Sequence, residues 1–176
     1  FYDFEGTDFT PDFLQKENII LTVGRIGTYQ KNTELLLETF AAVANEMPGW
    51  SVRIVGGIDA GFQKYIENYF VQFPGMKDRV TFTGVITDRK KMAEEYKHAK
   101  IFALTSRMEG GTPNVIAEAL SAGNYIVTSD IDAAEEAVDG GRTAIHTGGY
   151  LELYLRTLAP TNPVALGLLQ RVRPVN

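Results

Sequence analysis

The feature that most constrains this chain is a repeated alternation of short apolar runs with helix-like segments. Most of the runs are predominantly apolar, and most of them end at a glycine or a small polar residue. The segments between the runs repeat apolar residues at helical spacing. We expect strands at 19–23, 51–55, 80–83, 101–104, 125–128 and 143–146, and helices at about 36–47, 66–70, 88–98, 113–122, 132–138 and 150–158. Apolar strands that alternate with helices predict an α/β fold, a parallel sheet of about six strands with helices on both faces.

The alternation covers only part of the 176 residues. Residues 1–18 are aromatic and acidic without periodicity, and we interpret them as an interdomain linker. Residues 19–147 carry the sheet and form the main domain. Residues 148–176 are expected to form a partial helical segment, because prolines interrupt them and their last part has no regular pattern. The chain starts at Phe1 rather than at a methionine, so we expect it to be a fragment.

Composition argues against several classes of function. The chain has no cysteine, which excludes disulfides, thiolate zinc sites and cysteine nucleophiles. Seventeen basic and twenty-two acidic residues give a net charge of −5, which disfavours binding to nucleic acid or to anionic membranes. The sequence shows neither a membrane-spanning apolar run nor a signal peptide, so a cytoplasmic location is the default expectation.

In a parallel sheet of this kind, ligands bind outside the carboxyl ends of the strands. The first candidate there is the loop 24–32, where Gly24 and Gly27 let the backbone approach a ligand closely. Arg25 and Lys31 flank the start of a helix, and together they could hold a phosphate. The dinucleotide fingerprint GxGxxG is absent, which argues against an NAD-dependent dehydrogenase. A solvated loop with two surface cations is the alternative interpretation.

The second candidate is the loop 106–114. Gly110 and Gly111 precede Thr112 and Pro113, which are favoured as a helix N-cap and a first helical residue. Backbone N–H groups exposed in such a turn, at the positive end of a helix dipole, can bind an anion. A glycine-rich turn that only starts a helix is the alternative.

Glu118 belongs to the same helix, which is apolar nearly all round. Asn114, Glu118 and Ser121 share one narrow polar stripe on it. A carboxylate on a mostly buried helix needs partners, which the two hydroxyls of a bound ribose could supply. An internal hydrogen bond or salt bridge is the alternative.

Other polar features do not indicate a site. Residues 57–64 lack the Gly-Lys-Ser/Thr ending of a phosphate loop. Asp130 and Asp132 fit the start of a short helix better than a metal site, and His98 and His146 are isolated. The sequence therefore predicts no metal site.

Together these residues resemble the carboxy-terminal, donor-binding half of GT-B glycosyltransferases, specifically the retaining group 1 enzymes of glycosyltransferase family 4. The resemblance covers about residues 19–147. It rests on Leu21–Arg25 with Lys31, on Val80–Val85, and on Glu109–Gly123 followed by Tyr125–Ser129. It implies a Rossmann-like domain that forms one half of a GT-B enzyme and binds a nucleotide-diphosphate sugar.

The resemblance also implies roles for single residues. Arg25 and Lys31 would bind the donor diphosphate, and Glu109 would lie at the transferred sugar; these three are the expected catalytic residues. Glu118 would hold the ribose hydroxyls. The other expected donor-binding positions are Gly24, Val85, Ile86, Gly110, Gly111, Thr112, Asn114 and Val115, with Val85 and Ile86 beside the base.

The implied reaction transfers a hexosyl group from a UDP- or GDP-linked sugar to a glycan or lipid-linked acceptor, with retention at the anomeric carbon, in polysaccharide biosynthesis. Arg25, Lys31 and the helix that starts at Thr112 would stabilise the leaving diphosphate without a metal or another cofactor. The acceptor would bind through a missing amino-terminal domain, so we expect the fragment alone to be inactive. The whole enzyme could associate peripherally with the inner face of the membrane.

Two spacings depart from the family pattern. Glu109 and Glu118 enclose eight residues, where the family usually has seven, and the interval from Arg25 to Lys31 is one residue longer than usual. Both extra residues fall in glycine-containing loops, which absorb insertions readily. Two other functions stay open: a nucleotide-sugar epimerase of the same fold, and a non-catalytic nucleotide-binding module whose glycine loops are structural.

Overall fold

The computed structural model describes residues 12–111, 114–129, 131 and 144–146. Its described part is built on a six-stranded sheet in the order β3-β2-β1-β4-β5-β6. Every pairing in it is parallel. The strands are β1 (Glu17–Val23), β2 (Ser51–Val55), β3 (Val80–Gly84), β4 (Ala99–Leu104), β5 (Tyr125–Thr128) and β6 (Ala144–His146). The expected Rossmann-like parallel sheet is confirmed.

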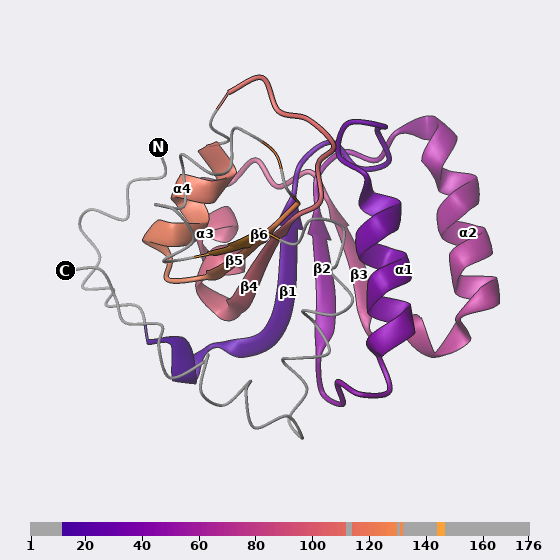
Figure 1. Ribbon diagram of the computed structural model, residues 1–176, viewed down its shortest axis with the longest axis horizontal. Helices are drawn as coiled ribbons and strands as arrows, with labels where there is room; N and C mark the ends of the chain where they lie inside the picture. The colour runs from indigo at the N-terminus through magenta and orange to yellow at the C-terminus, as the bar shows by residue number, and fades with distance from the viewer. Residues whose placement is uncertain (1–11, 112–113, 130, 132–143, 147–176) are drawn as a thin grey trace.

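Helices cover both faces of this sheet (Figure 1). Among the described residues they are α1 (Thr33–Val43), α2 (Gln63–Gln72), α3 (Arg89–His98) and α4 (Asn114–Ser121), with short 3₁₀ helices at Phe13–Gln15, Ala60–Phe62 and Pro74–Met76. The helices α1 and α2 lie on one face, and α3 and α4 lie on the other. None of the described helices is long and apolar enough to cross a membrane.

The side chains of alternate strand residues pack into two separate hydrophobic cores, one on each face of the sheet. Ile20 and Ile54 are buried in the core that contains α1 and α2. Leu21 and Phe102 are buried in the core that contains α3 and α4. Successive side chains of a strand point to opposite faces, so strands that are apolar on every residue can feed both cores. This is why the inner strands β1 and β4 show continuous apolar runs, whereas β3, the last strand at one end of the described sheet, alternates apolar residues with threonine.

The element boundaries agree with the sequence to within a few residues, and those of β2 agree at both ends. β1, however, begins at Glu17, inside the segment that we interpreted as linker. Glu17 pairs with Ala99 of β4, and a ladder of backbone hydrogen bonds forms whatever the polarity of the side chain. The helices expected at 132–138 and 150–158, and all of 148–176, lie outside the described residues.

The carboxyl ends of β1 and β2 approach each other so closely that one position must be glycine. Gly56 has a φ of +145°, and a Cβ there would lie 1.8 Å from the carbonyl oxygen of Gly24. The backbone N–H of Gly24 donates to Val55 at 3.0 Å, and that of Gly56 donates to Gly84 at 2.9 Å. These contacts fix the starting point of the loop that follows β1.

Candidate functional site

The two loops that the sequence singled out touch each other at the carboxyl edge of the sheet (Figure 1). We call residues 24–32 the first loop and residues 105–111 the second loop. They follow the adjacent strands β1 and β4, so they leave the sheet side by side. The backbone N–H of Arg107 donates to the carbonyl of Gln30 at 2.8 Å, and its Nη1 donates to the carbonyl of Tyr29 at 2.6 Å. The two loops therefore form a single cluster.

Lys31 and Glu109, which the sequence predicted as catalytic residues, form an ion pair between the two loops. Lys31 Nζ donates to Glu109 Oε1. The two side chains are only 18% and 9% exposed, so solvent and salt screen this pair less than a surface pair. Glu109 thus neutralises the cation that the sequence predicted for a diphosphate, and an incoming anion has to compete with Glu109 for it.

Gln30 and Ser106 also contact the Glu109 carboxylate. Ser106 Oγ donates to Oε1 at 2.5 Å, and Gln30 Nε2 donates to Oε2 at 3.2 Å. The amide oxygen of Gln30 accepts a hydrogen bond from Arg25 Nη2 at 2.7 Å. Sequence reasoning missed Gln30 and Ser106, because neutral polar side chains are ordinary in loops and no spacing marks them.

The two glycines of the first loop differ in what requires them. A Cβ on Gly24 would make only ordinary contact, at 3.5 Å, with Lys31 Cε. Gly27 has a φ of +81°, and a Cβ there would lie 2.2 Å from the side chain of Phe62. The packing of Phe62 therefore requires Gly27, so this glycine has a structural reason that is independent of any ligand.

The glycines of the second loop face open space. Gly110 and Gly111 are exposed, and a Cβ on either would meet no described heavy atom within 4 Å. The predicted cap residues, 112–113, lie outside the described residues. Helix α4 is described from Asn114, which is exposed, and Val115 after it is half-buried. The described residues just before and at the start of α4 are thus open enough for a ligand to reach their backbone.

Glu118 on α4 is half-buried and has an internal partner. Its Oε2 accepts a hydrogen bond at 2.7 Å from the hydroxyl of Tyr96, a fully buried residue of α3. Burial raises the pKa of the Glu118 carboxyl, and the hydrogen bond from Tyr96 opposes this rise. A carboxylate can accept several hydrogen bonds, so this contact leaves acceptor capacity for further donors.

The loop after β3 brings an exposed apolar side chain to the same edge of the sheet. Val85 is 68% exposed, and a Cβ on Gly57 would lie 3.5 Å from Val85 Cγ2. Val85 therefore lies against the loop that leaves β2. Ile86 is half-buried and packs against the core under α3 and α4. Of these two residues predicted to contact the base, Val85 is the one whose side chain is exposed to a ligand.

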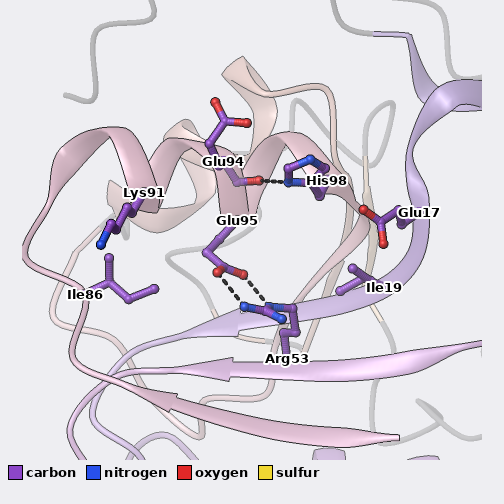
Figure 2. A pocket seen from close by; sticks show the side chains of 8 residues that line it. All are labelled: Glu17, Ile19, Arg53, Ile86, Lys91, Glu94, Glu95 and His98. Atoms are coloured by element: carbon purple, nitrogen blue, oxygen red, sulfur yellow. Dashed lines mark hydrogen bonds and ion pairs between the residues drawn. The ribbon is translucent and has the colours of Figure 1, made fainter.

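A separate hollow lies beneath α3, against β1 and β2 (Figure 2). It has a volume of about 380 Å³ and is lined by Glu17, Ile19, Arg53, Ile86, Lys91, Glu94, Glu95 and His98. Arg53 donates to both carboxylate oxygens of Glu95, at 2.5 and 2.7 Å, and these two side chains point toward each other across the hollow. Of the predicted site residues only Ile86 lines it, so this hollow is distinct from the two loops.

The features that the sequence set aside are consistent with ordinary structure where they are described. In the stretch 57–64, Asp59 accepts the backbone N–H of Gly61 at 2.9 Å and caps a short 3₁₀ helix. Asp130 and Asp132, and the side chain of His146, lie outside the described residues.

Comparison with known proteins agrees with the resemblance that the sequence indicated. A family model described as glycosyl transferases group 1 matches residues 17–153. The amylovoran biosynthesis glycosyltransferase AmsD of Erwinia amylovora is 34% identical over 113 residues, which cover 63% of this chain and 29% of AmsD. The lipopolysaccharide core biosynthesis mannosyltransferase LpsB of Rhizobium meliloti is 28% identical over 121 residues, 67% of this chain and 33% of LpsB. The chain thus spans about a third of the length of these curated relatives.

Solved structures of similar fold are glycosyltransferases and related enzymes. HepE of Anabaena, solved in complex with UDP, superimposes with a TM-score of 0.69 at 19% identity, over 91% of this chain and 43% of HepE. Sucrose-phosphate synthase from Thermosynechococcus elongatus has a TM-score of 0.67 at 25% identity, over 89% of this chain and 40% of the synthase. The expected half of a GT-B fold is therefore confirmed. Because the family model spans most of the sequence, the chain belongs to the group 1 glycosyl transferases.

Proposed function

We propose that this chain is the donor-binding domain of a glycosyltransferase. The whole enzyme would transfer a hexosyl group from a nucleotide-diphosphate sugar to a glycan or lipid-linked acceptor in polysaccharide or lipopolysaccharide biosynthesis. The observation that carries the proposal is the contact between the two loops, which gathers Arg25, Lys31 and Glu109 at the carboxyl edge of the sheet. The names of AmsD and LpsB support the biosynthetic role, and the UDP bound to HepE supports a nucleotide ligand.

In this proposal Arg25 and Lys31 bind the diphosphate. When the bond between the anomeric carbon and the diphosphate oxygen breaks, negative charge develops on the departing nucleoside diphosphate. Cations held at that point lower the barrier, and they do so without a metal. Arg25 is exposed, and a guanidinium has more donors than its contact with Gln30 uses, so donors remain for phosphate oxygens.

The rest of the donor would extend from the diphosphate along the same edge. Glu109 would face the transferred sugar, Glu118 would accept hydrogen bonds from the ribose hydroxyls, and Val85 would offer its exposed surface to the base. The remaining proposed donor contacts are Gly24, Ile86, Gly110, Gly111, Thr112, Asn114 and Val115. The open space around the two glycines of the second loop supports backbone contacts there.

The activity of the whole enzyme belongs to the same proposal. The relatives are about three times as long as the matched region, so the acceptor would bind to a second domain, and this chain alone would transfer no sugar. Retention at the anomeric carbon, a location at the cytoplasmic face of a membrane and peripheral membrane association are further parts of the proposal. A nucleotide-sugar epimerase would bind the same ligands but would convert the sugar without an acceptor, so an assay of the whole enzyme separates the two.

Titration calorimetry of the chain tests the proposal. The ligands are UDP, GDP, ADP, UDP-glucose, GDP-mannose and ADP-glucose, each with and without EDTA. We expect at least one of them to bind, EDTA to leave its affinity unchanged, and the double variant Arg25→Met/Lys31→Met to lose most of the binding. The double variant Arg89→Met/Lys90→Met removes the same charge from exposed positions of α3 and is the matched control.

Two results would count against the proposal. If none of the six ligands binds to the wild-type chain, donor binding is contradicted. If a ligand binds equally well to both double variants, its site lies elsewhere, for example in the hollow beneath α3.

A further inference from the structure

The three partners of Glu109 are not equivalent once a diphosphate arrives. Lys31 and Ser106 contact Oε1, and Gln30 contacts Oε2. Lys31 is the only one of the three that is charged, and a diphosphate carries more negative charge than one carboxylate. A bound diphosphate would therefore draw Lys31 away from Glu109, and a carboxylate that is 9% exposed would then depend on its two neutral partners.

Ser106 holds one oxygen of Glu109 from a rigid position. It is fully buried, it follows β4 closely, and its own carbonyl accepts a hydrogen bond from the Ser129 hydroxyl. One hydrogen bond fixes the position of Oε1 but leaves the carboxylate free to turn about it. The orientation of the carboxylate therefore depends on the partner of Oε2, which is Gln30.

The surroundings of Gln30 fix the direction of its amide. Arg25 can only donate, so the amide oxygen must face it, at 2.7 Å. The NH₂ group then faces two acceptors, Glu109 Oε2 at 3.2 Å and the carbonyl of Met108 at 3.2 Å. The backbone carbonyl of Gln30 is also held, by the N–H of Arg107. Gln30 is thus tied to the second loop through both its main chain and its side chain.

We infer that Gln30 is a positioning residue that keeps Glu109 directed at the sugar when Lys31 turns to the diphosphate. The inference rests on the proposed function, because it takes Glu109 to face the sugar of the donor. Gln30 itself touches neither sugar nor phosphate. Its loss therefore changes the contribution of the sugar to donor affinity and changes the contribution of the nucleotide much less.

Three substitutions remove the contacts of Gln30 with Arg25 and with Glu109, either one at a time or both together. Gln30→Glu keeps an acceptor for Arg25 but places a second carboxylate against Glu109. Gln30→Lys keeps a donor for Glu109 but gives Arg25 a cation instead of an acceptor. Gln30→Met removes both contacts, and Gln72→Glu on the exposed surface of α2 is the control for an added negative charge.

The quantity to measure is the affinity for a nucleotide-sugar divided by the affinity for its nucleoside diphosphate. The pairs are UDP-glucose with UDP, GDP-mannose with GDP and ADP-glucose with ADP, and the pair used is one that the wild type binds. A change of charge near the diphosphate affects both members of a pair, so most of it cancels in the ratio. The nucleoside diphosphate carries the larger negative charge, so the remainder would raise the ratio in Gln30→Glu, opposite to the fall expected from lost positioning, and would lower it in Gln30→Lys. High salt screens this remainder, so the ratios are compared at high salt. We expect the ratio to fall at least threefold in Gln30→Glu and Gln30→Met, and to stay near the wild-type value in Gln30→Lys and Gln72→Glu.

The outcomes separate this inference from the proposed function. A ratio that is unchanged in all three Gln30 variants, or that falls equally in Gln30→Lys, overturns the positioning role while donor binding stands. A wild type that binds none of the pairs contradicts donor binding itself, and the inference falls with it. A ¹H–¹⁵N spectrum of each variant checks that it is folded, so loss of structure is not counted as loss of positioning.

Discussion

Two positively charged side chains at each edge of the sheet can be compared, and the two pairs have different kinds of partner. At the amino edge, Arg79 and Lys16 donate to backbone carbonyls at the ends of helices. At the carboxyl edge, Lys31 and Arg25 contact a carboxylate and an amide on side chains. A carbonyl at a helix end cannot leave its partner unless the helix moves, whereas a side chain can be replaced by a ligand. The comparison separates cations that stabilise the fold from cations that can bind.

Arg79 is the clearest example at the amino edge. Its guanidinium donates to the carbonyls of Ala44, Met47 and Trp50 at 2.8, 2.6 and 2.9 Å. It also lies over the ring of Phe40, with 4.8 Å between Cζ and the ring centroid. One side chain thereby fastens the end of α1 and the turn after it to the start of β3.

Lys16 has the same function at the end of α3. It is 7% exposed, and its Nζ donates to the carbonyls of Tyr96 and Lys97 at 3.0 and 2.7 Å. Asn124 Nδ2 donates to the same Tyr96 carbonyl at 2.8 Å. A positive charge at the carboxyl end of a helix also interacts favourably with the helix dipole.

The largest effect is expected on stability, from removing the hydrogen bonds of Arg79 at the amino edge. Arg79→Met removes three charge-assisted hydrogen bonds and should lower the free energy of unfolding by about 3 kcal/mol, measured by urea denaturation. Nucleotide affinity of the folded protein should not change. Lys77→Met, at a nearby exposed position, is the control and should stay within about 0.5 kcal/mol of wild type. A loss below about 1 kcal/mol for Arg79→Met would refute its stabilising role.

At the carboxyl edge, the same kind of change should affect binding instead of stability. Lys31→Ala should lower the affinity for nucleoside diphosphate by about 1.5–3 kcal/mol, roughly tenfold to a hundredfold, because it removes a charged phosphate partner. Calorimetry measures the loss, and Lys90→Ala on the exposed side of α3 is the control. An unchanged affinity in Lys31→Ala would remove Lys31 from the site.

Lys31 has to leave Glu109 to bind a diphosphate, so a change at Glu109 should raise the nucleotide affinity instead of lowering it. Glu109→Gln keeps the size of the side chain but removes the carboxylate that competes for Lys31. Nucleoside diphosphate should therefore bind about fivefold more tightly, a gain of about 1 kcal/mol. Calorimetry at low and high salt checks this, since the gain should shrink as salt screens the charges. Weaker binding at both salt concentrations would show that Glu109 does not compete with the diphosphate.

The smallest effect concerns pH. Burial lowers the pKa of Lys16 from 10.5 to about 8. Between these values the unfolded chain holds a proton that the folded chain has released, so the free energy of unfolding should rise with pH. We expect a rise of about 1 kcal/mol or less between pH 8 and 10, because the bonds to the two carbonyls favour the charged form.

Urea denaturation of wild type and Lys16→Met from pH 7 to 10 measures this contribution as a difference. The range stops there because burial raises the pKa of Tyr69 to about 12, and ionisation of this tyrosine in the unfolded chain opposes the trend above pH 10. Equal slopes for the two proteins would contradict the assignment.

Much of the fold could be predicted because its signals are local. The apolar run of β2 and the turn residues that bound it gave both of its ends correctly. The meeting of the two loops followed from topology, since neighbouring parallel strands end at one edge. Local polarity misled us at the starts of β1 and β4, where backbone pairing of Glu17 with Ala99 extends both strands by two residues.

What could not be predicted depends on contacts between distant residues. Gln30 is a neutral loop residue until the second loop brings Glu109 against it. Gly27 is required by Phe62, which lies far along the chain, so the glycine alone could equally indicate ligand approach. Arg79 is an unremarked cation before β3 in the sequence, and its three carbonyl partners become visible only when α1 is packed.

A crystal structure of the chain with a bound nucleoside diphosphate tests the central claim most directly. Our account predicts both phosphates within hydrogen-bond distance of Arg25 and Lys31, with Lys31 separated from Glu109 and Glu109 still bonded to Gln30 and Ser106. A diphosphate bound anywhere else, with the ion pair between Lys31 and Glu109 intact, would contradict it.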